Sequence, residues 1–514
     1  MLSKTYSGAV NGVDAYTVEI EINATGQGED TIINIVGLPD AAIRESRDRV
    51  QSAMLSCNYH FPGGKLVINL APADVKKEGA AFDLPIAMGI IASTGKIERE
   101  PLARTMLVGE LALNGAVRPV KGVLPIAVNA GRMPDLDALL VPTENAAEAA
   151  IASGNVPVYG VDTLVDAVSF LKGEYDRPPV KADLGKFLSQ NRSAHSHDFG
   201  EVKGQHTAKR ALEIAAAGGH NILMIGPPGT GKSMLSKRLV GILPPMHVNE
   251  TLESSKIHSI LGLLPAGTPV LAERPFRAPH HTISDAGLLG GQTIPTPGEI
   301  SLAHNGVLFL DELPEFKRNV LEVLRQPLEN GNVTISRAAG SFTFPANFML
   351  VAAMNPCPCG HYGNVHRVCR CTPPQIQRYR ARISGPLLDR IDIHVELAHL
   401  SEDELVNAPT GDTSAAIRVR VASARSLQQM RFEGLGFYCN SQMGPSQLQA
   451  FCGLDGESQS YLRHSIRELH MSARAYDRIL RVSRTIADLE GSTGITQDHI
   501  FEAVQYRFLD KRMW

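Results

Sequence analysis

NILMIGPPGTGKSMLSKRLVGIL is the sequence of residues 221–243. Four of its first five residues are apolar, as in a short buried strand, and the last ten have helical apolar spacing. A Gly-rich loop between a strand and a helix directs successive backbone N–H groups toward the phosphates of a nucleotide. We therefore predict a phosphate-binding loop in a parallel α/β sheet, and not a glycine turn that carries a lysine by chance.

The residue types of this loop suit ATP and Mg²⁺. Lys232 would neutralise the phosphates, and the hydroxyl of Ser233 would ligate the metal ion. The predicted nucleotide contacts are Gly226, Pro227, Pro228, Gly229, Thr230, Gly231, Lys232 and Ser233.

Two carboxylates end a second apolar run, GVLFLDE at residues 306–312. In a P-loop ATPase the first carboxylate, here Asp311, holds Mg²⁺, and the second, Glu312, polarises the attacking water. A capping aspartate at the end of an ordinary strand would explain the segment taken alone. Its position after a phosphate-binding loop favours the catalytic interpretation.

Three further polar residues are candidates for contact with the γ-phosphate. Asn355 ends a third apolar run, FMLVAAM at residues 348–354, although Asn-Pro is also a common turn. Arg390 precedes the helical part of the chain and Arg474 starts one of its helices, so one could act from a neighbouring subunit and the other within its own. Surface salt bridges explain both arginines equally well from spacing alone.

The composition is that of an ordinary globular protein with several domains. A chain of 514 residues exceeds one core, and we expect three domains. The net charge of -3 excludes a uniformly basic coat, so nucleic-acid binding would need local patches. The sequence has no apolar run of membrane-spanning length and no basic start before an apolar core, so we expect a cytoplasmic protein without membrane contact.

The pattern of apolar residues predicts three domains and a linker. Residues 1–172 form an α+β domain, 173–198 a Pro-containing polar linker, 199–395 the nucleotide-binding core and 396–514 an all-α domain. Expected strands of the first domain are 16–22, 31–36, 65–70 and 106–111, with helices at 41–55 and 82–93. Expected helices of the last domain are 415–429, 459–469, 473–489 and 497–508.

Four segments together resemble the ComM/YifB family, bacterial relatives of magnesium-chelatase ATPase subunits. These are ALEIAAAGGHNILMIGPPGTGKS (211–233), LFLDELPEF (308–316), MNPCPCG (354–360) and SGPLLDRIDIHVE (384–396). The resemblance covers nearly the whole chain. It implies an AAA+ P-loop core, an N-terminal domain similar to the Lon-protease and RadA C-terminal fold, and a C-terminal helical lid.

The resemblance also implies a function. Such a protein would be a ring-forming, hexameric, ATP-driven DNA helicase or translocase that promotes branch migration as single-stranded DNA is integrated during natural transformation or recombination. Its partners would be single-stranded and branched DNA. By the same resemblance Arg390 looks like an arginine finger acting in trans, Arg474 like a second sensor and Asn355 like a first sensor.

The N-terminal domain departs from the proteolytic pattern of Lon. A serine protease of that kind needs a serine nucleophile and a lysine base. The corresponding stretch here, EGAAFD at residues 78–83, contains no hydroxyl, and Lys121 stands out of register for the base. We therefore expect a non-proteolytic domain that serves assembly or DNA binding.

A block from Asn330 to Leu388 contains arginines but no aspartate or glutamate. Arginine contacts to phosphates give sequence-independent affinity, as a translocase requires. Arg337 lies near the turn of a predicted hairpin at 332–344 and is the first candidate for DNA contact. Arg274 and Arg277, before a Gly-rich stretch, are the second. Subunit interfaces or nearby carboxylates would explain such arginines as well, and a surface excursion would explain the Gly-rich stretch.

Four cysteines, Cys357, Cys359, Cys369 and Cys371, form two CxC pairs after Asn355. Four thiolates could hold a tetrahedral Zn²⁺ and order the loop. Reduced thiols without metal and redox disulfides are the alternatives.

Two rivals to the DNA motor fit the same motifs. One is a chelatase-type ATPase that drives a protein partner to insert a metal into a tetrapyrrole. The other is a DNA-binding scaffold whose ATP site controls assembly only.

Overall fold

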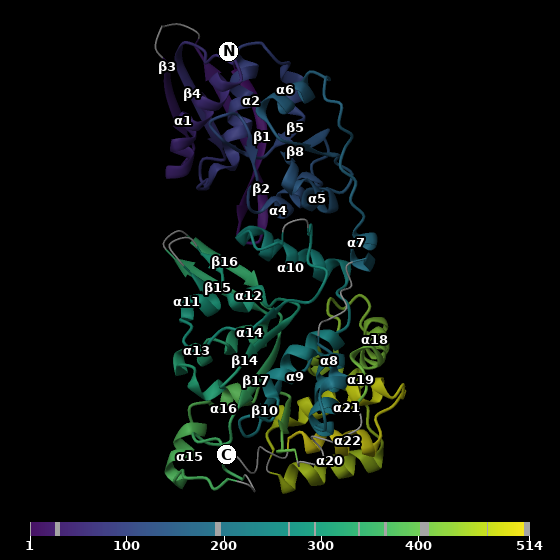
Figure 1. Cartoon of the computed structure of the whole chain (residues 1–514). Coiled ribbons are helices and arrows are strands. Elements are labelled where there is room, and N and C mark those ends of the chain that lie inside the picture. Colours follow the sequence, from purple (N-terminus) through teal and green to yellow (C-terminus); the bar gives the residue numbers. More distant parts are fainter. Residues whose placement is uncertain are drawn as a thin grey trace. The chain divides into compact units, whose positions relative to one another are not determined.

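A computed structural model describes residues 2–25, 31–190, 197–265, 268–291, 295–337, 340–363, 367–400, 411–469 and 471–507 (Figure 1). Its contacts divide the chain into two compact units. Unit 1 comprises Met1–Arg192 and His247–Ala272, and unit 2 comprises Ser193–Met246 and Glu273–Trp514. The predicted core at 199–395 is thus interrupted, because His247–Ala272 packs with the N-terminal unit.

Unit 1 is built on a seven-stranded mixed sheet in the order β3-β4-β2-β1-β5-β8-β9. Strand β2 pairs antiparallel with β1 and β4, and the other pairs are parallel. The strands are β1 (Leu2–Asn11), β2 (Asp14–Ala24), β3 (Thr31–Val36), β4 (Gly64–Ala71), β5 (Thr105–Leu107), β8 (Ala138–Pro142) and β9 (Val158–Val161), and β6 (Glu110–Leu111) pairs separately with β7 (Val117–Arg118).

Helices cover both faces of this sheet. Successive residues of a strand face opposite sides, and in β8 Leu140 joins the core beneath one set of helices while Leu139 joins the other. Helix α2 is buried along its whole length, which explains its uniformly apolar sequence. The helices are α1 (Ala41–Ser56), α2 (Asp83–Ser93), α3 (Arg99–Ala103), α4 (Val123–Ala130), α5 (Thr143–Ala152), α6 (Leu164–Leu171), α7 (Leu184–Gln190) and α10 (Val248–Leu261).

Several elements of unit 1 differ from the sequence expectation. Strands β8 and β9 were not among the expected strands, and the expected strand at 106–111 is divided between β5 and β6. Strand β1 was not predicted, because its inward side chains include the hydroxyl residues Ser3, Thr5 and Ser7 instead of an apolar series. Helix α7 lies inside the segment predicted as a linker.

Unit 2 contains a five-stranded sheet in the order β11-β14-β17-β10-β18, and all its pairs are parallel. Its strands are β10 (Ile222–Ile225), β11 (Phe276–Arg277), β14 (Val307–Leu310), β17 (Met349–Met354) and β18 (Ile393–Glu396). Because β10 lies between β17 and β18, the chain reverses its winding direction there, where parallel sheets bind ligands at the carboxyl edge. The alternating α/β core predicted from the sequence is confirmed.

Helices and two small hairpins surround this sheet. The core helices are α8 (His206–Gly218), α9 (Lys232–Leu239), α11 (Asp285–Leu289), α12 (Glu299–Leu302), α13 (Arg318–Glu322), α14 (Arg325–Asn330), α15 (Pro373–Arg380) and α16 (Gly385–Leu388). The hairpins pair β12 (Gly290–Gly291) with β13 (Thr296–Pro297), and β15 (Asn332–Arg337) with β16 (Gly340–Pro345). The second hairpin agrees with the prediction, since Arg337 pairs with Gly340 next to its turn.

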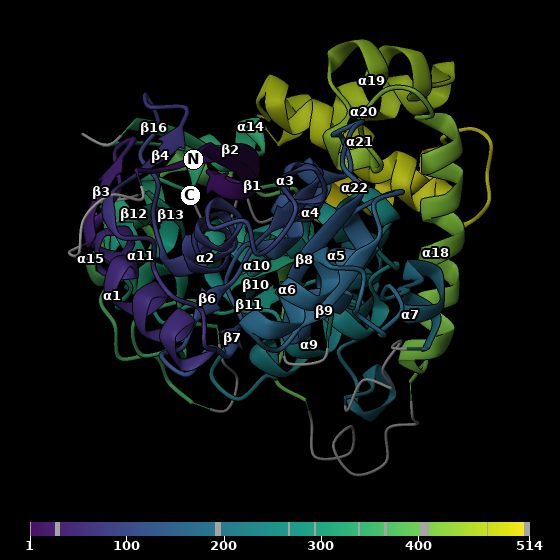
Figure 2. The ribbon, with the colours of Figure 1, turned by 90° about the horizontal axis from the view of Figure 1, so that it is seen from above.

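The regular elements after β18 are helical and group on one side of unit 2 (Figure 2). They are α18 (Ser414–Arg431), α19 (Pro445–Phe451), α20 (Gly456–Glu468), α21 (Ala473–Leu489) and α22 (Gln497–Gln505). Helices α18 and α21 pack on α8, and their apolar residues join the core of the sheet in one cluster.

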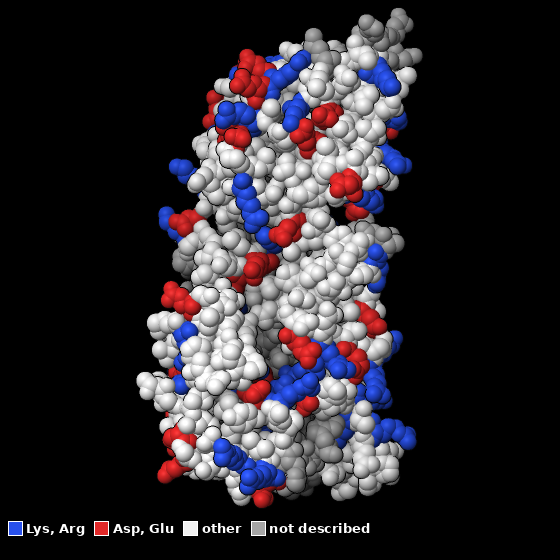
Figure 3. Space-filling model, turned by 180° about the vertical axis from the view of Figure 1, so that it is seen from behind, with Lys and Arg blue, Asp and Glu red and all other residues white. Residues whose placement is uncertain are grey.

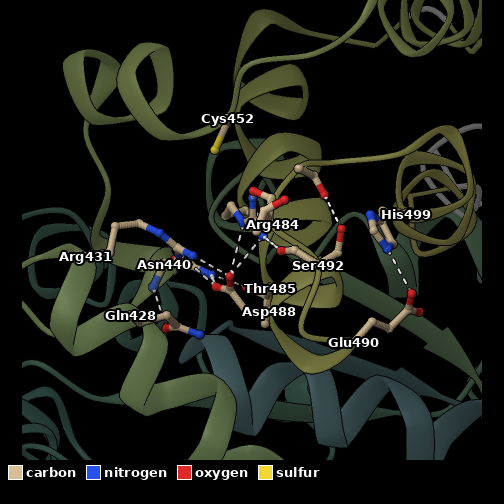
Figure 4. A network of polar contacts seen from close by, with 12 residues as sticks. Gln428, Arg431, Asn440, Cys452, Arg484, Thr485, Asp488, Glu490, Ser492 and His499 are labelled. Atoms are coloured by element: carbon tan, nitrogen blue, oxygen red, sulfur yellow. Dashed lines mark hydrogen bonds and ion pairs between the residues drawn. The ribbon is translucent and has the colours of Figure 1, made fainter.

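A buried polar network braces this helical group (Figure 4). The carboxylate of Asp488 accepts hydrogen bonds from Arg431, Asn440 and Arg484. Buried charges need such partners, because an unpaired carboxylate in a core is costly. Among the described residues, no helix combines the length and the apolar character needed to cross a bilayer.

Candidate nucleotide site

The predicted phosphate-binding loop joins the carboxyl end of β10 to the amino end of α9. Gly229 and Gly231 have φ values of +83° and +90°, a backbone region that side chains disfavour. This conformation turns the loop around the helix terminus, where free N–H groups and the helix dipole favour an anion.

Lys232, the first residue of α9, lies over the loop. Its Nζ donates to the carbonyl oxygens of Gly226 at 2.6 Å and Pro227 at 2.9 Å, and to Oδ1 of Asn355 at 3.2 Å. Burial lowers the pKa of Lys232, and the charges of Asp311 and Glu312 oppose that shift. The structure therefore brings the predicted lysine and the predicted first sensor together.

The two predicted Mg²⁺ ligands also meet. Oγ of Ser233 donates to Oδ2 of Asp311 at 2.6 Å, although the two residues belong to different strand–helix segments. Hydroxyl and carboxylate oxygens are the donors that Mg²⁺ prefers, so this pair fits the ion.

Glu312 follows at the end of β14 with its side chain about half exposed. Its φ is +51°, which is uncommon for a residue with a side chain and often marks a functional position. The backbone N–H of Glu312 donates to Oδ1 of Asp311 at 2.9 Å. The two adjacent carboxylates have different partners, Ser233 for Asp311 and His281 for Glu312.

His281 was not predicted as a site residue, and the structure brings it to Glu312. Its Nδ1 lies 3.6 Å from Oε2 of Glu312, and its ring meets Phe316 edge-on. For this stretch the sequence suggested only the DNA contacts of Arg274 and Arg277. The signal that would have identified His281 is its place just after β11, which pairs with β14.

The contacts described for Arg390 and Arg474 are with residues outside the phosphate-binding loop. The Asn221 side chain donates to the carbonyl of Arg390, and Nη1 of Arg474 lies 3.7 Å from Oδ2 of Asp389. Both contacts lie at the amino edge of the sheet, whereas the loop leaves its carboxyl edge, about 13 Å away along a four-residue strand. The expectation that one of these arginines acts within its own subunit and the other in a neighbouring one stays a prediction.

The side chain of Arg390 is almost fully buried and donates to Glu329 and to the carbonyl of Pro386. Its Nε has no hydrogen-bond partner within the described part of the chain. Glu329 is half exposed, so the ion pair sits at the surface of unit 2.

The three arginines predicted to contact DNA have different environments. Arg337 is exposed at the tip of the β15–β16 hairpin. Arg274 donates to the carbonyl oxygens of Pro244 and Asn305, and Arg277 forms a two-pronged pair with Glu299. The contacts of Arg274 and Arg277 hold together segments of unit 2. Contacts of this kind within the protein were the alternative to DNA binding for these arginines.

The four clustered cysteines converge. All four Sγ atoms lie within 4.8 Å of one another, and three of the pairs are separated by 3.4, 3.6 and 3.7 Å. A tetrahedron of thiolates around Zn²⁺ at 2.3 Å has edges of about 3.8 Å, whereas a disulfide needs about 2.05 Å. The cysteines are free thiols, so the spacing fits a metal better than a disulfide.

Backbone hydrogen bonds prepare this cluster for a metal. N–H groups of His361 and Arg370 donate to Cys359 and lower the pKa of its thiol to about 6. The N–H groups of Tyr362 and Cys371 donate to Cys357 and Cys369. The pKa of these two thiols is nevertheless raised, that of Cys357 mainly by burial. Since thiolates are the ligands of Zn²⁺, such donors favour the binding form.

Residues 78–83, the stretch that the sequence led us to compare with a protease nucleophile turn, end in a buried aspartate with a structural role. Asp83, at the start of α2, accepts hydrogen bonds from Ser46, from Arg49 and from the N–H of Leu111. Burial raises the pKa of Asp83, and the bonds from Arg49 and Ser46 oppose it. These contacts tie α1 to α2.

Three family comparisons cover most of the chain. The family described as magnesium chelatase, subunit ChlI, matches residues 198–405, and its C-terminal family matches 411–507. A third family, described as subunit ChlI of Mg-chelatase, matches residues 18–145.

Similar proteins extend over the full length. Competence protein ComM of Haemophilus influenzae is 44% identical over 508 residues, covering 98% of this chain and 97% of that protein. Escherichia coli YifB is 42% identical over 518 residues, covering 99% and 98%. The magnesium-chelatase 38 kDa subunit of Rhodobacter capsulatus is 27% identical over 177 residues, covering 31% of this chain and 50% of that protein.

Proposed function

Because this chain belongs to the ComM/YifB family of magnesium-chelatase-like AAA+ proteins, we propose that it is an ATP-driven DNA helicase or translocase that promotes branch migration. The family implies ATP hydrolysis with Mg²⁺. The observation that carries the proposal is the contact of Ser233 with Asp311 beside Lys232.

The site residues divide the work of hydrolysis. Backbone N–H groups of residues 226–233 and the ammonium of Lys232 hold the triphosphate. Mg²⁺, held by Ser233 and Asp311, would withdraw charge from the phosphate oxygens. Glu312 accepts a proton from the water that attacks the γ-phosphorus, the bond to the bridging oxygen breaks, and ADP and phosphate leave.

Asn355 and His281 would control the geometry of this step. Asn355 contacts Lys232 directly, so it can report the position of the γ-phosphate to β17. His281 contacts Glu312 and can hold its carboxylate toward or away from the water.

Several observations support DNA as the partner. The H. influenzae relative is named a competence protein, and the acid-free block contains the exposed hairpin with Arg337. Positive and negative side chains are mixed over the face in Figure 3, so a local basic element is needed for phosphate contact. We assign that contact first to Arg337. Arg274 and Arg277 could contact a DNA phosphate only by giving up their hydrogen bonds to other residues of unit 2.

The positions of two arginines support a ring of subunits as part of this proposal. Arg390 and Arg474 contact residues at the opposite edge of the sheet from their own loop, and an arginine supplied to another chain's nucleotide accelerates hydrolysis. We propose a hexamer in the cytosol in which both arginines act across subunit contacts. We also propose that Cys357, Cys359, Cys369 and Cys371 bind a structural Zn²⁺.

The test is the rate of ATP hydrolysis with and without single-stranded and forked DNA at moderate salt. We expect DNA to raise the rate of the wild-type protein and forked DNA to be unwound, while Lys232→Ala shows neither activity. An ATPase that ignores DNA and leaves a branched substrate intact would overturn the motor proposal.

The chelatase-type alternative rests on the three family descriptions that name a chelatase subunit. It predicts hydrolysis that responds to a protein partner instead of DNA. The scaffold alternative predicts DNA binding that depends on nucleotide but consumes none. The same assay separates all three.

A further inference from the structure

The cysteine cluster packs against the phosphate-binding loop. We call Cys357–Gly363 and Arg367–Cys371 the cysteine knuckle. Gly360 has a φ of +78°, and a side chain there would come within 2.6 Å of Cδ of Pro228. The backbone of the knuckle therefore touches the nucleotide loop with no room between them.

A second connection runs through α15, which begins two residues after Cys371. The backbone N–H of Asn355 donates to the hydroxyl of Tyr379, whose pKa is raised by burial. Nε and Nη2 of Arg380 both donate to the carbonyl of Pro356 at 3.2 Å, and the guanidinium lies 5.2 Å from the ring of Tyr362. Helix α15 thus holds the residues on either side of the Asn355–Pro356 bond.

These contacts end at the lysine of the loop, because Asn355 accepts a hydrogen bond from Lys232. The segment with the four thiols is thus connected to the loop in two ways. Gly360 contacts Pro228, and Asn355, which lies just before this segment, contacts Lys232.

The knuckle has little apolar packing of its own. Cys357 is fully buried, but Tyr362 is 50% exposed and Val368 88% exposed. A short segment of this kind buries little apolar surface with which to order itself, and a metal held by the four thiolates would supply that order.

We propose that the metal-bound knuckle holds the phosphate-binding loop and Asn355 in the conformation that receives ATP, so that loss of the metal weakens nucleotide binding. The metal acts without touching the nucleotide. This inference rests on the proposed nucleotide and zinc sites and adds their coupling.

The test uses the full-length protein and two readouts, zinc per chain by elemental analysis and affinity for a fluorescent ATP analogue with Mg²⁺. The double variant Cys369→Ser/Cys371→Ser removes two ligands, and Cys57→Ser in unit 1 is the matched control. We expect one zinc per wild-type and control chain, none in the double variant, and a nucleotide affinity roughly tenfold or more weaker in the double variant.

Two further arms keep the test independent of misfolding. A zinc-selective chelator applied to wild-type protein should weaken nucleotide binding, and added zinc should restore it. Tyr379→Phe keeps the ring and the metal but loses the hydroxyl that holds Asn355, so hydrolysis should fall roughly threefold to tenfold with zinc still bound.

The outcomes are distinct. Unchanged nucleotide affinity after zinc loss overturns the coupling and leaves the motor proposal standing. A wild-type protein that binds nucleotide but no zinc overturns the knuckle as a metal site. A wild-type protein that retains zinc but binds no nucleotide overturns the proposed function itself.

Discussion

Lys232, Ser233, Asp311 and Asn355 meet in direct hydrogen bonds, although they come from three strand ends. The carboxyl ends of β10, β14 and β17 lie at one edge of a parallel sheet, so side chains that follow them face the same crevice. This edge concentrates one ammonium and the carboxylates of Asp311 and Glu312. The arrangement suits a triphosphate with its Mg²⁺.

Replacing Glu312 by glutamine should separate hydrolysis from binding. The amide keeps the shape of the side chain but accepts no proton, so turnover should fall by roughly 100-fold or more while ATP still binds. Lys232→Ala should lose both, because the phosphates lose their positive partner. Equilibrium binding and phosphate release measure the two properties. Normal turnover by Glu312→Gln would show that another residue activates the water.

Replacing His281 by alanine should slow hydrolysis and spare ATP binding. The imidazole contacts Glu312 and not the phosphate-binding loop, so its loss misplaces the water-activating carboxylate, at a cost of up to roughly 100-fold in rate. The exposed His60 of unit 1 is the control for histidine loss. An equal rise in the nucleotide dissociation constant would contradict the positioning role.

At the scale of elements, β18 and α21 are joined through a buried ion pair. Asp392, next to β18, lies 3.1 Å from Nε of Arg478 on α21 and accepts the N–H of Asn221. Burial alone would raise the pKa of Asp392, but the bond and charge of His220 and the charges of Arg478 and Arg481 hold it below its usual range. Burial also lowers the pKa of Arg478, yet a guanidinium stays charged in proteins, so the carboxylate determines the pH dependence.

Asp392→Asn should therefore destabilise unit 2 by about 3 kcal/mol at pH 7, because it leaves buried arginine charge uncompensated. A depressed pKa contributes stability above the unfolded value of 3.8 that is lost as pH falls toward the folded value. The difference from wild type should thus shrink between pH 4 and pH 2. Urea unfolding across this range measures it, with Asp412→Asn at an exposed pair as the control. A difference independent of pH would contradict this account.

Local patterns predicted many elements but not all. The range 31–36 was predicted as a strand and 473–489 as a helix, and both match β3 and α21. Their apolar residues recur with a clear strand or helix period, so the local sequence alone was enough to predict them. Strand β1 was not predicted. Its buried face carries hydroxyl side chains, so its sequence lacks the alternation of apolar and polar residues by which a strand is recognised.

At the scale of the whole molecule, the chain crosses between units more often than the predicted domain order implied. His247–Ala272 leaves unit 2 after α9 and packs its helix α10 on α4 of unit 1. There Ser259 donates to the buried carboxylate of Glu148. The helix that follows the phosphate-binding loop is therefore connected to the N-terminal unit by a few residues of chain.

Mixed rings should reveal arginines that act across subunits. Arg390→Ala should lower hydrolysis by roughly 1000-fold, since a finger arginine stabilises the transition-state charge. Mixing it with Lys232→Ala, which has a defective loop but an intact Arg390, should restore part of the activity. Phosphate release measured against the mixing ratio gives the result. If mixed oligomers form but hydrolysis is not recovered, Arg390 acts at the nucleotide site of its own subunit.

The sequence by itself determined the chemistry. A strand, a glycine loop, a lysine and a pair of acids are local patterns, and local backbone preferences bring each into its conformation. Only the tertiary structure decided which of these groups meet. It joined Ser233 to Asp311, paired Arg277 with Glu299, set Arg474 beside Asp389 and pressed Gly360 against Pro228. Contacts between residues far apart along the chain depend on how whole elements pack, and that information is absent from any single segment.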